Sequence, residues 1–173
     1  RKAMKAKALA KAQTEARATM AKNWIAENGV LTGAADGGTI GSAKNYENFE
    51  LILDWKTEGE AAMGIRSIPQ IALGGKNSGA LTGNMLHDNA APKAAANGPQ
   101  EWNTMQVKVV SDRVTVVLNG VTTAENVILE NACNREIPAY AEGQILLIAG
   151  NAPLNVREMY IRELPATPRF ELS

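Results

Sequence analysis

The chain has 173 residues, one of which is cysteine, and its 18 Lys and Arg balance its 18 Asp and Glu. This length fits one domain with a real core, and the balanced charge provides no overall field that would draw nucleic acid to the protein. Cys133 alone permits no disulfide within the chain, and the longest strongly apolar run, 145–149, is far shorter than the ~20 residues that cross a bilayer, so we predict no membrane span.

Residues 1 to about 22 predict a helix, because they are rich in Ala and Lys and their apolar residues recur every four positions. That narrow stripe consists of Met4, Ala8, Ala12, Ala16 and Met20. This segment contains seven basic residues and one acidic residue. Such an excess fits contact with an acidic partner or, more simply, a solvated face on a docked helix. We expect residues 3–22 to be helical and Met4, Leu9 or Met20 to pack onto the domain or onto a neighbouring chain.

From Trp24 onward, short runs of alternating apolar and polar residues are cut by turn signals such as Asn28-Gly29. The clearest run is 45–57, which predicts a half-buried strand because every second residue from 49 to 55 is large and apolar. Residues 106–110 and 113–118 predict a hairpin around Ser111-Asp112, and 144–149 with 156–164 predict a last pair of strands.

Residues 74–100 show no period and predict a long loop, of a kind that is usually functional or mobile. Many short strands without βαβ alternation indicate an antiparallel sandwich of two sheets. The alternation predicts a core that contains Phe49, Leu51, Leu53, Val107, Val109, Val114, Val116, Ile145 and Ile161.

Several short motifs occur in a fixed order along the chain. They are Asn48-Phe49-Glu50-Leu51 with Asp54-Trp55-Lys56, then Glu101-Trp102-Asn103-Thr104, Leu118-Asn119-Gly120 and Ile161-Arg162-Glu163-Leu164-Pro165. In this order and spacing they resemble the 3-keto-disaccharide hydrolase family, once catalogued as a domain of unknown function, in a Bacteroidetes-type form. The resemblance implies an all-β fold: an antiparallel two-sheet jelly roll like that of concanavalin A, here with one N-terminal α-helix.

On this reading the chain divides into a helix at 1–23, a jelly-roll domain at 24–165 and a tail at 166–173. The first strand of the family, which contains Phe-Asn-Gly, has no counterpart here, so the chain reads as a fragment. The resemblance also implies a periplasmic or extracellular location.

The functional strand of the family, Asp-Ser-Gly-Ile-x-Leu-Arg-Gly-x-Pro-Gln-Val-Gln-Ile-Trp-Asp, aligns without gaps to residues 60–75. Arg66, Pro69 and Gln70 match, and Glu60 stands at the Asp. The next motif, Gly-Ser-Gly-Gly-Leu-Tyr-Asn-Asn, meets 77–84, where Ser78, Gly79, Leu81 and Asn84 are kept.

The chain departs from the family at several polar and aromatic positions. Ala61, Ala72, Gly74, Gly75 and Thr82 stand where the family has Ser, Gln, Trp, Asp and Tyr. The family's Leu-Gln-x-His-Gly appears as Leu147-Ile148-Ala149-Gly150-Asn151, so the Gln and the His are both replaced. These departures bear on catalysis more than on the fold.

The family resemblance implies cleavage of a glycoside whose sugar carries a ketone at C3. The ketone makes the C2 proton acidic, so the reaction needs a base, a partner for the enolate and an acid for the leaving group. The matches assign Arg66 to the enolate or keto oxygen and Glu60 to the base, with Gln70, Ser78 and Asn84 binding substrate. His87, the only histidine, is the candidate for proton transfer near neutral pH. The simpler alternatives are that Arg66 forms a structural ion pair and that Glu60 and His87 are solvated loop residues.

No metal site is predicted, because the acidic residues are isolated, although a divalent cation that stabilises the enolate is left open. Two functions therefore follow. The first is a hydrolase or lyase of 3-keto-glycosides; the second is a non-catalytic glycan-binding protein or a structural subunit of a cell-surface assembly. In both, the expected partner is an oligosaccharide or glycoside, and a homo-oligomer or surface complex is left open.

Overall fold

The computed structural model describes residues 2–82, 95–131, 134 and 136–168. One helix and twelve strands occur in these ranges. They are α1 (Lys2–Asn23), β1 (Trp24–Glu27), β2 (Val30–Gly33), β3 (Gly38–Gly41), β4 (Phe49–Thr57), β5 (Ala61–Gly64), β6 (Gln70–Leu73), β7 (Leu81–Thr82), β8 (Asn103–Val110), β9 (Arg113–Leu118), β10 (Val121–Ile128), β11 (Leu146–Ala149) and β12 (Leu154–Glu163).

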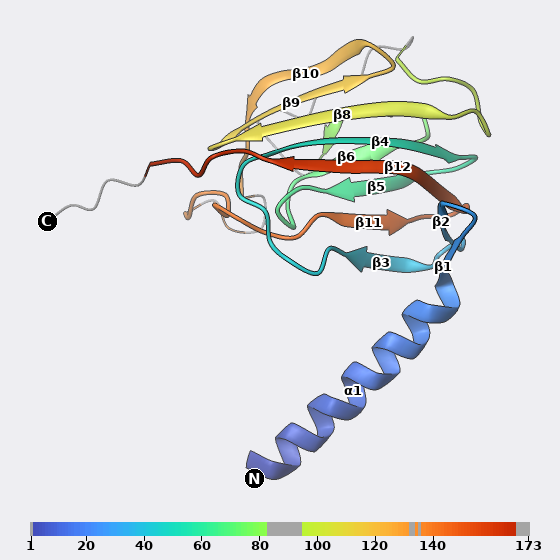
Figure 1. Cartoon of the computed structure of the whole chain (residues 1–173), viewed down its shortest axis with the longest axis vertical. Helices are drawn as coiled ribbons and strands as arrows, with labels where there is room; N and C mark the ends of the chain where they lie inside the picture. The colour runs from blue at the N-terminus through green and yellow to red at the C-terminus, as the bar shows by residue number, and fades with distance from the viewer. Residues whose placement is uncertain (1, 83–94, 132–133, 135, 169–173) are drawn as a thin grey trace, which may run out of the picture.

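The strands form two antiparallel sheets that pack on each other as a sandwich (Figure 1). The seven-stranded sheet has the order β1-β2-β12-β4-β8-β9-β10, and the five-stranded sheet has the order β3-β11-β5-β6-β7. The predicted all-β jelly-roll sandwich with an N-terminal helix is therefore confirmed.

The core lies between the sheets and follows the period of two in the sequence. On β4, residues 49, 51, 53 and 55 are buried and the residues between them are not. The buried residues of β8 and β9 lie beside those of β4, with Leu51 next to Val107 and Val107 next to Val116. Of the predicted core residues, all are buried except Ile161, which is partly buried against the core. The five-stranded sheet contributes Met63, Ile71, Leu81 and Leu147 from the other side.

The prediction that 144–149 and 156–164 pair with each other is wrong. Strand β11 lies between β3 and β5 in the five-stranded sheet, whereas β12 lies between β2 and β4 in the seven-stranded sheet. The alternation of a strand fixes which face is buried but says little about its partner, and the chain crosses the sandwich between these two strands. The predicted loop at 74–100 is likewise interrupted by β7, which pairs with β6.

Helix α1 leads away from the sandwich, as Figure 1 shows, and contacts it at its C-terminal end, near β1 and β3. Its side chains from 10 to 22 are exposed, and Met20, at 41% exposure, is not buried against the sandwich. The side chains of Met4 and Leu9 fall outside the description. Packing of α1 onto a neighbouring chain stays a prediction. Among the described segments, no helix has the length and apolarity that crossing a bilayer requires.

Candidate functional site

Arg66 lies just beyond β5 and is only 2% exposed. Its guanidinium donates to main-chain carbonyls on three separate segments: Nε to Glu47 O at 2.8 Å, and Nη1 to Ser111 O at 2.6 Å and to Tyr140 O at 3.4 Å. Nη2 donates to Glu47 O and to Asn48 Oδ1. Burial lowers the pKa of this guanidinium. A hollow of about 220 Å³ adjoins Arg66, but the Arg66 guanidinium donates to protein oxygens around it.

The other predicted site residues are dispersed. Glu60 is exposed, and its backbone N–H donates to Asn151 Oδ1 at 2.8 Å. Five residues lie between Glu60 and Arg66, and the four of them that form β5 extend over about 13 Å. Ser78 is buried, and its hydroxyl closes a turn by donating to Gly75 O at 3.0 Å. Asn84 and His87 lie outside the described residues. The structure thus does not bring Glu60 and Arg66 together, and the catalytic roles stay predictions.

Gln70 lies on the outer face of the five-stranded sheet. This sheet includes β5 and β6, which lie within residues 60–75, the segment that aligns with the family's functional strand. Two rows of side chains cross this face, because their sequence neighbours Met63, Ile71 and Leu147 point into the core. The rows are Gly41, Leu146, Gly64, Gln70 and Thr82, and Thr39, Ile148, Ala62 and Ala72. Neither row contains a titratable side chain, so these described strands offer no acid or base for proton transfer.

The outer face of the seven-stranded sheet is richer in polar groups and owes part of its surface to a bulge in β12. Arg157 pairs with Asp54 and Tyr160 pairs with Ile52, so β12 has one extra residue between these two positions. Residues three apart on a regular strand would point to opposite faces. The extra residue, with Glu158 at a φ of 48°, places both Arg157 and Tyr160 on the outer face.

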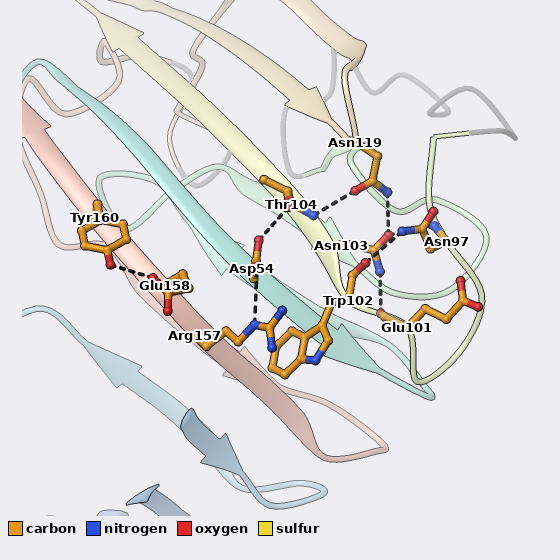
Figure 2. A network of polar contacts seen from close by, with 10 residues as sticks. All are labelled: Asp54, Asn97, Glu101, Trp102, Asn103, Thr104, Asn119, Arg157, Glu158 and Tyr160. Carbon is orange, nitrogen blue, oxygen red and sulfur yellow. Dashed lines mark hydrogen bonds and ion pairs between the residues drawn. The ribbon is translucent and has the colours of Figure 1, made fainter. Parts of the chain in front are cut away.

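Arg157 is held from two sides, as Figure 2 shows. Its Nε donates to Asp54 Oδ2 at 3.2 Å, and its guanidinium carbon lies 4.0 Å from the centre of the Trp102 ring. Asp54 in turn accepts a hydrogen bond from Thr104 Oγ1 at 2.6 Å. Lys56 Nζ lies 5.0 Å from the centre of the same Trp102 ring. The guanidinium is therefore fixed in place by an ion pair and a cation–π contact.

A hollow of about 570 Å³ opens on the same face over β4, β8, β9 and β12. Its apolar and aromatic lining includes Ile52, Val117 and Tyr160, and Tyr160 is 62% exposed. The Tyr160 hydroxyl donates to Glu158 Oε2 at 2.6 Å, and this bond raises the pKa of the phenol. The polar lining comprises Glu50, Gln106, Lys108, Thr115 and Arg162.

Glu50 joins the two cations of the hollow. Lys108 Nζ lies 3.3 Å from Glu50 Oε1, and Arg162 donates to Glu50 Oε2 through Nε at 3.0 Å and through Nη2. The hydrogen bond from Arg162, followed by that from Lys108, lowers the pKa of Glu50. The rim thus presents N–H and carboxylate groups in an order fixed by the sheet register.

Two of the motifs that carry the family resemblance meet at one end of β8. Asn119 donates through Nδ2 to Asn103 Oδ1 at 2.8 Å, and its own Oδ1 accepts from the N–H of Thr104 at 2.8 Å (Figure 2). Asn119 adopts a φ of 50° in the turn after β9. These asparagines therefore fix the turn that holds Trp102 beside Arg157, so the two motifs have a scaffold role in this chain.

In the described part of the chain, no group of three or more His, Cys, Asp or Glu side chains is arranged to hold a metal ion. No sequence motif gave a role to Arg157, Tyr160 or Lys108. The alternating pattern of apolar residues predicted their strands. It did not show the bulge that places Arg157 and Tyr160 on the same face.

The fold is a two-sheet antiparallel β-sandwich of the jelly-roll type. A model of the 3-keto-α-glucoside-1,2-lyase-like domain matches residues 7–162. The chain therefore belongs to this family, which confirms the resemblance seen in the motifs. No curated protein matches the chain.

Solved structures agree with this assignment. A candidate glycosyl hydrolase from Parabacteroides distasonis is 25% identical, with a TM-score of 0.65 over 83% of this chain and 91% of that one. Another from the same organism is 19% identical, with a TM-score of 0.67 over 82% and 74% of the two chains. The carbohydrate-binding module CBM66 from Bacillus subtilis is 15% identical, with a TM-score of 0.60 over 81% and 91%. The last two show the fold alone.

Proposed function

We propose that this protein binds a glycan on the outer face of the seven-stranded sheet and does not cleave it. The observation that supports binding is the 570 Å³ hollow, which combines an apolar and aromatic lining with charged and amide groups. Sugars present both apolar C–H faces and hydroxyl groups, so a site of this kind suits them: apolar surface provides contact area and a few fixed polar groups orient the ligand.

We propose that the protein does not cleave the glycan because other residues stand at the family's functional positions. At two of these positions the structure has no room for the family's side chain. Gly150 stands where the family has His, and a Cβ at Gly150 would lie 1.9 Å from the carbonyl oxygen of Glu60. Gly74 stands at the family's Trp, with a φ of 76° and a Cβ position 2.1 Å from Gly59 O. Arg66 donates to main-chain carbonyls. An oxyanion partner needs donors that are free to meet the developing charge.

The second candidate is a hydrolase or lyase of 3-keto-glycosides, and family membership favours it. In that reaction a base removes the C2 proton of the 3-keto sugar, and the C1 substituent then leaves as it takes a proton from an acid. Glu60 and His87 would be the proton-transfer groups, with Gln70 among the substrate-binding groups. The similarity to a candidate glycosyl hydrolase also supports this alternative. The periplasmic or extracellular location remains a proposal under either function.

Calorimetry and turnover assays on one preparation distinguish the two candidates. Cellotriose, maltotriose and trigalacturonate serve as binding probes, and release of free 3-keto sugar from a 3-keto-glycoside serves as the turnover assay. We expect binding of at least one probe and no release of sugar above the uncatalysed rate. Measurable turnover by the wild-type protein would replace our proposal with the enzyme.

Two exposed tyrosines provide a matched pair of variants for the binding site. Tyr160 lines the hollow, whereas Tyr140 is 46% exposed and does not line it. Tyr160→Ala should weaken binding about tenfold or more, because the exposed aromatic surface that contacts the sugar is lost. Tyr140→Ala should bind like the wild type. Equal binding by both variants would place the glycan elsewhere.

A further inference from the structure

Five cations and three anions stand on the outer face of β4, β8, β9 and β12, whereas the whole chain is balanced. The cations are Lys56, Lys108, Arg113, Arg157 and Arg162, and the anions are Glu50, Asp54 and Glu158. Such an excess favours a ligand that carries negative charge.

The donors that remain available on this face are concentrated at one end of it. Among the described residues, Arg157 uses only Nε in a hydrogen bond, and neither of its Nη atoms has a protein acceptor. Lys56 Nζ has no carboxylate within 4.0 Å in the described part of the chain. By contrast, Lys108 and Arg162 both pair with Glu50, and Arg113 lies beside Asp112 and donates to Asn126 O.

The Arg157 guanidinium is also unusually well fixed for an exposed group. Asp54 holds its Nε edge, Trp102 covers one face, and Thr104 fixes Asp54. A planar guanidinium with a free N–H edge matches the two oxygens of a carboxylate, and holding it in advance lowers the entropy lost on binding. Lys56 supplies a second positive charge next to the same indole ring.

The distance to the hollow suits a ligand of more than one sugar. Along β4, Ile52 in the hollow and Asp54 beside Arg157 are two residues apart, which is about 7 Å, and Lys56 is about 7 Å further on. A second hollow of about 250 Å³, lined by Lys56, Glu58 and Asn155 among others, continues the surface at that end. Glu58 in this second hollow interacts with Gln100.

We propose that the ligand is an acidic oligosaccharide, with one sugar in the hollow beside Tyr160 and the carboxylate of a neighbouring uronic acid on the Nη edge of Arg157, near Lys56. This inference rests on the proposed glycan-binding function and names its substrate class. Arg157 is then the residue that determines specificity for a charged sugar over a neutral one.

The test compares trigalacturonate with its fully methyl-esterified form, because the ester removes the charge and keeps the sugar. We expect the acid to bind at least about tenfold more tightly, since hydrogen bonds to charged groups contribute at about this scale. Arg157→Gln and, separately, Lys56→Gln should each weaken binding of the acid and leave that of the ester nearly unchanged. Raising the salt concentration should weaken the binding of trigalacturonate and leave the binding of its ester unchanged.

Lys11→Gln is the matched control, because it removes one positive charge from α1, far along the chain from the sheet face. It should bind trigalacturonate like the wild type. If Arg157→Gln lowers the melting temperature, Lys56→Gln still tests the site. Equal affinity for acid and ester would overturn the acidic-sugar inference and leave glycan binding intact. A sulfated trisaccharide that binds where trigalacturonate does not would overturn the carboxylate assignment, and failure of every probe would overturn the proposed function as well.

Discussion

Arg66→Ala should destabilise the fold substantially, because the side chain joins three segments that are distant in sequence. It donates to carbonyls of Glu47, Ser111 and Tyr140 from a position that is 2% exposed. A hydrogen bond from a charged donor contributes about 1.5–3 kcal/mol, and each buried carbonyl left without a partner costs about 1–3 kcal/mol. Counting only the hydrogen bonds to the carbonyls of Glu47 and Ser111, at about 1.5–3 kcal/mol each, we expect a loss of about 3–6 kcal/mol.

For a chain of this length, a loss of that size corresponds to a fall in melting temperature of about 10 °C. Urea unfolding followed by tryptophan fluorescence measures it directly, because Trp24 and Trp55 are buried in the core. Arg162→Ala is the matched control: its side chain is 73% exposed and its partner is a surface carboxylate, so the change should stay within about 1 kcal/mol. A loss below about 1 kcal/mol for Arg66→Ala would refute the structural role and return Arg66 to consideration as a site residue.

Two further predictions concern charge and packing. Because Arg162 and Lys108 hold the pKa of Glu50 below 4.5, this ion pairing stabilises the fold above pH 4.5 and is lost as the pH falls through the lower folded value. An NMR titration of the Glu50 carboxylate should give a midpoint below 4.5, and Arg162→Gln should raise it; an unchanged midpoint in that variant would contradict the assigned cause. Gly150→Ala should cost about 1–3 kcal/mol, since its Cβ would collide with Glu60 O at 1.9 Å. Gly98→Ala, whose Cβ would lie 3.8 Å from Glu101, should change stability by less than about 0.5 kcal/mol, and equal effects of the two would refute the collision.

The sequence by itself determined which residues form the core, because burial on one face of a strand requires apolar side chains at every second position. Leu51, Val107 and Val116 could be assigned in this way, and so could the hairpin at Ser111-Asp112. The order of the motifs also indicated the family, and in the structure two of these motifs meet through a hydrogen bond between Asn119 and Asn103, which are 16 positions apart.

The tertiary structure decided which sheet each strand joins and which polar groups meet. Alternation gives a strand its buried face but not its neighbour, so β11 and β12 were paired in the prediction although they lie in opposite sheets. A motif match located Arg66 in the sequence, but its acceptors come from residues 19, 45 and 74 positions away, which no local pattern reveals. Arg157 and Tyr160 share the outer face only because β12 bulges between them, and a single extra residue reverses the direction of every side chain that follows it.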